Sequence, residues 1–202
     1  MDETGISARQ TLIDSAVSLF LEQGFDAVSM EQVRLKAGVS NGSLYHHFPT
    51  KGHLVRCAYL SALKDYQGHM VAAIDAATSA ADGVRALVTR HIAWVLGAPR
   101  KALVLDRLRS FTAIEGTQPD WEAENAEPFS HLKSWIALQV ARGDMQKLPF
   151  KVWMALVLGP SMQLTSLWAS QARPTVEPRV RDALADAAWW AVRAQAHMKG
   201  RR

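Results

Sequence analysis

Residues 28–51 contain two short helical patterns joined by a tight turn, and this stretch constrains the fold more than any other part of the chain. Ser29 and Gln32 have the spacing of a capping box, which predicts a helix that ends at Gly38. A second short helix follows the turn, and Pro49 ends it because the residue before a proline disfavours helical backbone. Helix, turn and helix at this spacing are typical of the motif that places one helix start in the major groove of DNA.

Apolar residues recur at helical spacing along almost the whole chain, and strand patterns are nearly absent. The prediction is an all-α protein of about nine helices, in which a long fourth helix links an N-terminal head to a bulkier body. We place the head at residues 6–66, with its motif at 29–48, and the body at 67–198. The nine helices are expected near residues 7–23, 29–38, 41–48, 50–78, 82–97, 99–115, 120–142, 150–171 and 177–198.

Composition favours a soluble, cytoplasmic protein. With 49% hydrophobic and 21% charged residues in 202, the chain is ordinary for a globular protein with a sizeable core. Cys57 is its only cysteine, which excludes an intramolecular disulfide and fits a reducing compartment. The segment Met1–Gly5 lacks the pattern of a signal peptide, and no apolar run approaches the roughly 18 residues of a membrane span.

The positive charge of the head is confined to the motif. Residues 1–26 carry one basic side chain against five acidic ones, whereas residues 29–56 carry four basic side chains against Glu31 alone. A basic patch on the motif itself indicates a polyanionic partner. Another basic cluster, which we interpret as a solvated tail, ends the chain at Arg193, Lys199, Arg201 and Arg202.

Polar side chains at the start of the second motif helix have the chemistry for reading DNA. Asn41 and Ser43 can bond base edges or phosphates, and the Tyr45 hydroxyl can reach phosphate. Lys51 lies in the first turn of the fourth helix, where the helix dipole disfavours a cation unless a phosphate docks there. Each residue taken alone could also be a solvated or capping side chain. The expected DNA contacts are Ser29, Arg34, Ser40, Asn41, Gly42, Ser43, Tyr45, His46 and Lys51.

The motif resembles that of the tetracycline-repressor (TetR) family of bacterial one-component regulators. Residues 37–51 closely follow that family's pattern, and residues 19–25 resemble the end of its first helix. The resemblance covers about residues 6–66, and the pair Gly52-His53 departs from it where the family often has an acid. It implies a homodimer whose last two helices form the interface and whose middle helices enclose an effector pocket. An effector would then release the operator DNA.

The body contains a candidate ligand pocket, and the roles of His91 and of the tryptophans there each have two interpretations. His91 lies on an apolar helical face, either as a core histidine bonded to a carbonyl or as a hydrogen-bond partner in a pocket. The tryptophans of the body either wall a cavity or fill the core. A mostly apolar pocket with few polar groups agrees with the composition. The expected pocket residues are His91, Trp94, Arg107, Phe111, Thr112, Phe129 and Ile136.

Two apolar stripes near the end of the chain are candidates for a dimer interface. The first stripe lies on both sides of the pair Gly159-Pro160, and we expect this pair to kink the helix that carries the stripe. The other contains alanines that permit close helix approach. Both stripes could instead complete the core of the protomer. The expected interface residues are Trp153, Leu156, Leu164, Trp168, Leu184 and Ala188.

The sequence offers no catalytic constellation, no cofactor motif and no metal-ligand spacing among its histidines. The favoured hypothesis is a transcriptional repressor that binds a palindromic operator as a dimer and responds to a small, mostly apolar effector. A second hypothesis keeps the DNA-binding head but replaces the effector with a recruited protein partner. A third, an enzyme with an aromatic active site in the body, has no supporting residues.

Overall fold

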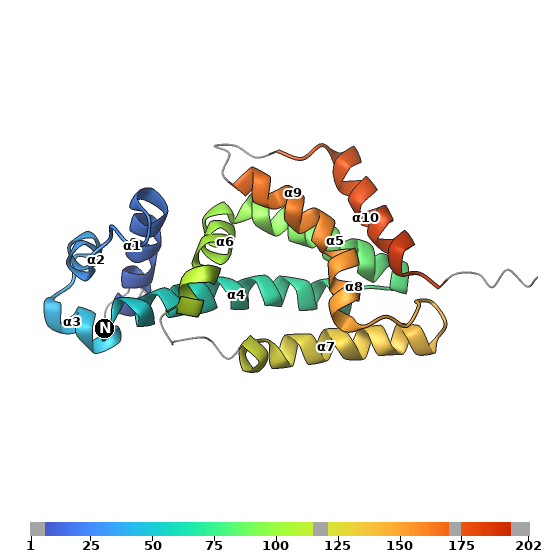
Figure 1. The fold of residues 1–202 in the computed structure, drawn as a ribbon, viewed down its shortest axis with the longest axis horizontal. Coiled ribbons are helices and arrows are strands. Elements are labelled where there is room, and N and C mark those ends of the chain that lie inside the picture. Colours follow the sequence, from blue (N-terminus) through green and yellow to red (C-terminus); the bar gives the residue numbers. More distant parts are fainter. Residues whose placement is uncertain (1–6, 115–120, 170–174, 195–202) are drawn as a thin grey trace, which may run out of the picture. The chain divides into compact units, whose positions relative to one another are not determined.

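The computed structural model describes residues 7–114, 121–169 and 175–194, and the side chains of residues 7–107, 126–167 and 175–194. Within these residues the chain is all-helical, which confirms the predicted fold class (Figure 1). The ten helices are α1 (Ala8–Gln23), α2 (Met30–Ala37), α3 (Asn41–His47), α4 (Lys51–Asp75), α5 (Ala80–Gly97), α6 (Pro99–Ile114), α7 (Trp121–Ala141), α8 (Phe150–Val157), α9 (Gly159–Ala169) and α10 (Pro178–Val192).

The segment expected to be one kinked helix over 150–171 is two helices, and this accounts for the extra helix. α8 ends at Val157, and α9 begins at Gly159. Pro160 has no N–H to donate to the carbonyl of Leu156, so a continuous helix would lack that hydrogen bond. In the first turn of a new helix the missing N–H costs nothing, which explains why the break falls just before this proline.

The chain forms two compact units. Unit 1 contains residues 1–65 and 99–121, and unit 2 contains residues 66–98 and 122–202. Helix α4 contributes its first part to unit 1 and its last part to unit 2. Helix α6 belongs to unit 1, whereas the sequence analysis placed this segment in the body.

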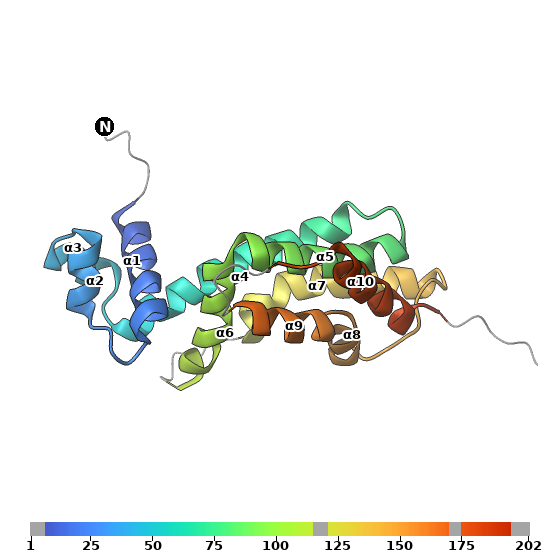
Figure 2. The same cartoon turned by 90° about the horizontal axis from the view of Figure 1, so that it is seen from above.

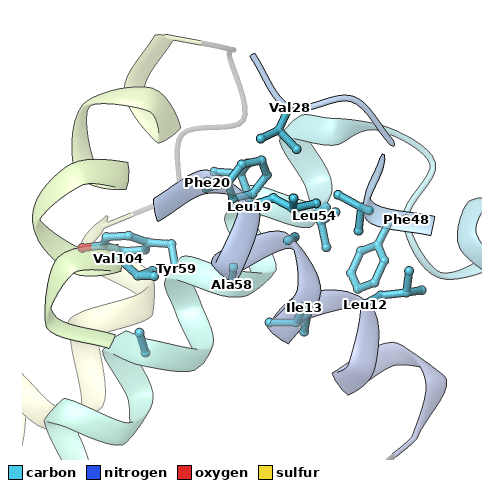
Figure 3. Close-up of a cluster of buried hydrophobic side chains, with 14 of the residues drawn as sticks. Leu12, Ile13, Leu19, Phe20, Val28, Phe48, Leu54, Ala58, Tyr59 and Val104 are labelled. Atoms are coloured by element: carbon cyan, nitrogen blue, oxygen red, sulfur yellow. The ribbon is translucent and has the colours of Figure 1, made fainter. Parts of the chain in front are cut away.

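Unit 1 is built around α1, which packs against α2, α3 and α6. Its core contains side chains from five helices, and Figure 3 shows Phe48 beside Leu12 and Leu54. Tyr59 of α4 and Val104 of α6 lie together at another edge of the same cluster and are 1% exposed each. Because Leu44 of α3 and its C-cap residue Phe48 both lie in this core, a helix of only seven residues is held in place by tertiary packing.

Local signals in the sequence fix the helix ends of unit 1. The predicted capping box of α2 is complete: the Ser29 hydroxyl accepts from the N–H of Gln32, whose side chain accepts from the N–H of Ser29. At the start of α1 only half of a capping box forms. Ser7 accepts from the N–H of Gln10, but the Gln10 side chain donates to Asp14 instead.

Unit 2 is organised around α5, which packs against α8, α9 and α10 (Figure 2). Its core includes the fully buried Trp153 of α8 with Val84 and Val88 of α5. A short backbone pairing outside the helices joins Met145 to Arg193. In the described part of the chain, no helix has the length and apolar character needed to span a membrane.

Candidate functional site

Helix α3 has a buried face and an exposed face. Leu44 and Phe48, four residues apart, are both 0% exposed and anchor the helix in the core of unit 1. The opposite face carries polar side chains, among them Tyr45, which is 49% exposed. Four of the predicted DNA contacts therefore share an exposed surface of one short helix. These residues are Asn41, Gly42, Tyr45 and His46.

The remaining predicted contacts lie at the starts of α2, α3 and α4, except Arg34, which lies in the last turn of α2. Ser40 caps α3 by accepting from the N–H of Ser43 at 3.2 Å. Ser40 is exposed, and Ser43 is half-buried. Ser29 caps α2 and is exposed. Each of these two hydroxyl oxygens already accepts a backbone hydrogen bond, yet a hydroxyl retains a hydrogen to donate to phosphate.

Lys51 is the first residue of α4. Its ammonium lies 4.1 Å from the ring centroid of Phe25, a cation–π contact that directs the half-buried side chain toward the end of α1. Thr50 caps the helix by accepting from the N–H of His53 at 3.1 Å. The first turn of α4 contains no acid, so no carboxylate of its own balances the helix dipole.

Arg34 is occupied within the protein. Its guanidinium lies 2.7 Å from each carboxylate oxygen of Glu31 and donates to the backbone carbonyl of Val39 at 3.0 Å. The Arg34 guanidinium lowers the pKa of the Glu31 carboxyl by bonding its charged form. This set of bonds places Arg34 at the turn between α2 and α3.

His91 is the centre of a buried polar cluster in unit 2. Its Nδ1 lies 3.0 Å from the hydroxyl of Tyr66 on α4, and its Nε2 lies 2.9 Å from Oγ1 of Thr165 on α9. The Thr165 hydroxyl in turn donates to the carbonyl of Met162 at 3.2 Å. A hydrogen-bonded chain therefore links three helices through one histidine.

Each ring nitrogen of His91 has a hydroxyl oxygen within hydrogen-bond distance. Because a hydroxyl can both donate and accept, a neutral imidazole bonds on both sides in either tautomer. Burial lowers the pKa of His91 to about 4, opposed by a backbone hydrogen bond with Ser161, so the ring is neutral at pH 7.

The structure brings only some of the predicted pocket residues together. Trp94 is buried on the helix of His91 and packs edge-on against Tyr66, with 5.0 Å between ring centroids. Ile136 lies in the core of unit 2, and Phe129 packs against Phe150 at 5.4 Å. The side chains of two further predicted pocket residues lie outside the described residues. These are Phe111 and Thr112.

Arg107 belongs to unit 1, apart from this cluster. It lines a half-open hollow of about 450 Å³ at the end of α1, formed mainly by residues 20–27. Its Nη1 lies 3.5 Å from the carbonyl oxygen of Leu21. Conversely, the sequence analysis did not identify Tyr66 and Thr165, because hydrogen bonds across 25 and 74 positions leave no local signal.

The predicted interface residues divide between the core and the surface of unit 2. Trp153 is 0% exposed and Ala188 is 3% exposed, so both pack inside the protomer. Leu156 is exposed, whereas Leu164 and Leu184 are half-buried. The side chain of Trp168 lies outside the described residues. Other exposed large apolar side chains on α8, α9 and α10 are Val152, Met162, Leu167, Val180 and Trp190.

Among the described residues, no group of three or more histidine, cysteine or acidic side chains has the arrangement of a metal site. The nearest acid–histidine contact pairs His131 Nε2 of α7 with Asp75 of α4 at 2.7 Å. This pair is exposed and joins the two helices at the surface.

Comparisons with known proteins match the motif region. The family described as "Bacterial regulatory proteins, tetR family" matches residues 12–57. The TetC protein of transposon Tn10 from Escherichia coli is 42% identical over 57 residues, which are 28% of this chain and 29% of that protein. The transcriptional repressor KstR2 of Rhodococcus jostii is 44% identical over 55 residues, 27% of each chain. The chain thus spans less than a third of the length of these two relatives.

Two solved structures extend the similarity to the whole fold. A TetR-family transcription regulator from Marinobacter aquaeolei superposes with a TM-score of 0.78 over 93% of this chain and 96% of that one, at 17% identity. A second from Shewanella superposes with a TM-score of 0.76 over 94% and 100%, at 21% identity. At these identities the similarity establishes the arrangement of helices, while the motif region carries the similarity in sequence.

Proposed function

We propose that the chain, whose residues 12–57 match the tetR family of bacterial regulatory proteins, is a DNA-binding transcriptional regulator of that family. In this proposal it acts as a repressor, binds a roughly palindromic operator as a homodimer, and leaves the operator when a small effector binds. Two of the matched relatives, KstR2 of Rhodococcus jostii and UidR of Escherichia coli, are named as a transcriptional repressor and a transcriptional regulator.

One observation carries the DNA-binding proposal. Leu44 and Phe48 fix α3 in the core, while Asn41, Tyr45 and His46 lie on its exposed face. A helix that is rigidly held and exposes donors and acceptors has the properties needed to read base edges in a major groove. Cationic and hydroxyl groups at the starts of α2 and α4 lie at the ends of the same motif and supply phosphate contacts.

The proposed dimer uses the exposed apolar side chains of α8, α9 and α10. Leu156 and Val180 are 37% and 38% exposed, and Trp190 is 59% exposed. Large apolar side chains clustered at a surface are typical of protein interfaces. Two heads held by one dimer would bind two half-sites, which supplies the affinity that a single head lacks.

The proposed effector site adjoins the His91 cluster. Trp94 and Tyr66 provide aromatic surface, and the cluster provides a few buried polar groups, a combination common in ligand pockets. Because His91 is neutral at pH 7, the site favours an uncharged, mostly apolar compound over an anion.

Selection of duplexes from a random DNA pool, followed by anisotropy titration, tests the proposal. We expect one palindromic sequence family to be enriched and bound far more tightly than a scrambled duplex of the same composition. Failure of the protein to bind any duplex at low salt would contradict the proposed function.

For the effector, a thermal-shift screen of small apolar compounds is expected to yield at least one that raises the melting temperature and weakens DNA binding. A panel without effect would favour a protein partner in place of an effector.

A further inference from the structure

Arg34 connects the end of α2 to the turn that precedes α3. Its Nε and Nη2 atoms each lie 2.7 Å from a carboxylate oxygen of Glu31, one helical turn earlier. Its Nη1 donates to the carbonyl of Val39 at 3.0 Å. The planar guanidinium uses its fork on one side and a remaining donor on the other, a geometry that an ammonium group does not reproduce.

Val39 is held by Arg34 at both of its backbone polar groups. The N–H of Val39 donates to the backbone carbonyl of Arg34 at 3.3 Å, while the carbonyl of Val39 accepts from the Arg34 side chain. Val39 directly precedes Ser40, the residue that caps α3. The peptide that leads into α3 is therefore fixed in position and direction by a single arginine.

The ion pair with Glu31 orients this arginine and neutralises it. The side chain of Arg34 is 24% exposed, compared with 58% for Glu31, so the guanidinium is the more enclosed partner. A phosphate contact by Arg34 would have to compete with a bidentate carboxylate. Its contribution to counterion release on DNA would be small while Glu31 stays bound.

We propose that Arg34 is a positioning residue for DNA recognition: held by Glu31, it clamps Val39 and so sets the direction in which α3 presents its exposed face. This inference rests on the proposed DNA-binding function. It replaces the phosphate contact that the sequence pattern assigned to Arg34, and it gives Glu31, an acid on the motif, a structural reason for its position.

The two roles of Arg34 predict different effects of substitution. A phosphate contact would make Arg34→Met lower the slope of log K against log salt by about 0.9, with Arg34→Lys close to wild type. A clamp predicts that both variants keep the slope but lower the preference for the selected duplex over a scrambled one. The expected loss is roughly ten-fold, the size typical of a hydrogen bond to a charged group.

Glu31→Gln distinguishes the roles a second time. If Glu31 only screened a phosphate-binding arginine, its neutralisation would tighten binding to both duplexes. If Glu31 orients the clamp, the variant is expected to lose preference for the selected duplex, as the Arg34 variants do. Lys36→Met is the matched control, because Lys36 is an exposed cation on the same helix whose ammonium lies 3.6 Å from a carboxylate oxygen of Glu22 on α1.

Amide hydrogen exchange in the free protein tests the clamp without DNA. The amides of Leu44 and Phe48 bond within α3, at 3.0 and 2.9 Å. We expect Arg34→Met and Arg34→Lys to speed their exchange roughly ten-fold, the effect of losing one such bond locally. The amide of the buried Leu87 in α5 is the reference for global unfolding and is expected to exchange as in wild type.

The outcomes separate this inference from the proposed function. Unchanged exchange at Leu44 and Phe48, or a reduced salt slope with an unchanged duplex preference, would overturn the clamp. A wild-type protein that binds no duplex would overturn the proposed function, and the exchange experiment would still decide whether Arg34 fixes α3.

Discussion

The indole of Trp135 on α7 lies directly over Gly83 on α5. A β-carbon added to Gly83 would stand 2.8 Å from Cη2 of the indole and closer still to Cζ2. Gly83 is buried, and its own backbone is helical. The indole occupies the space that a side chain at position 83 would fill.

Gly83→Ala is therefore expected to lower the free energy of unfolding. Overpacking in a well-packed core typically costs about 1–3 kcal/mol, which exceeds the gain of about 1 kcal/mol that alanine brings to a helix. Urea unfolding followed by circular dichroism measures the difference.

Gly68→Ala is the matched control for this substitution. Gly68 lies inside α4, is exposed, and has nothing within 4 Å of an added β-carbon. The Gly68→Ala substitution is expected to raise the free energy of unfolding by up to about 1 kcal/mol. A Gly83→Ala variant as stable as wild type would show that the indole moves aside freely.

The stability of the protein is expected to fall as the pH drops from about 6.5 toward 4, in part because of His91. The pKa of His91 is about 4 in the folded protein and 6.5 in the unfolded chain, so the unfolded chain binds more protons in this window. The full difference corresponds to roughly 3 kcal/mol at most. Below pH 4 both forms are protonated and the effect no longer grows.

His91→Gln isolates this contribution, because glutamine does not titrate and can still bond on both sides. Urea unfolding at pH 7, 6, 5 and 4 would be compared for the two proteins. We expect the wild type to lose more stability than the variant on acidification. Parallel pH profiles would show that His91 is accessible to protons in the folded state.

Lys51→Ala is expected to weaken binding to all duplexes and to lower the slope of log K against log salt by about 0.9, the value for one phosphate. The reason is the position of Lys51 at the start of α4, within the charge patch of the motif. Anisotropy titrations on selected and scrambled duplexes at several salt concentrations provide the measurement.

Asn41→Ala tests the loss of a base contact, in contrast to the loss of a phosphate contact in Lys51→Ala. Asn41 lies on the exposed face of α3, so its loss should cost about 1–3 kcal/mol of discrimination between bases and leave the salt slope unchanged. Equal losses for both variants on both duplexes would contradict the roles assigned to the two residues.

Leu156→Glu is expected to raise the dissociation constant of the proposed dimer by at least about ten-fold, because it places a charge among apolar side chains at the interface. Sedimentation velocity over a concentration series measures the change. Leu138→Glu is the matched control, since Leu138 is 47% exposed on α7, outside the surface of α8, α9 and α10. Trp153→Ala should instead lower the free energy of unfolding by about 3–5 kcal/mol, as expected for a fully buried tryptophan. A Leu156→Glu protein that sediments as wild type would remove this surface from the proposed interface.

The features that the sequence predicted correctly depend on neighbours along the chain. The Ser29–Gln32 capping box and the end of α2 at Gly38 each follow from residues only a few positions apart. In these cases the partners meet wherever the helix lies in the fold. Local pattern was therefore enough to define the motif.

The features that sequence analysis missed depend on tertiary packing. An apolar stripe has the same pattern whether it faces a core or a second subunit, so Trp153 looked like an interface residue although it is fully buried. Arg107 was grouped with the body because nothing along the chain shows that α6 packs in unit 1. The spacing of Glu31 and Arg34 permitted an ion pair, but the bond to Val39 requires the geometry of the turn.

The hydrogen-bonded series Tyr66–His91–Thr165 joins a phenol, an imidazole and a hydroxyl from three helices. Loss of the phenol would remove one partner of the buried imidazole, and loss of the imidazole would remove one partner from each hydroxyl. Mutations that arise one at a time must therefore pass through a less stable protein at these positions. Over evolutionary time, lineages related to this protein should keep the trio intact or exchange it as a set.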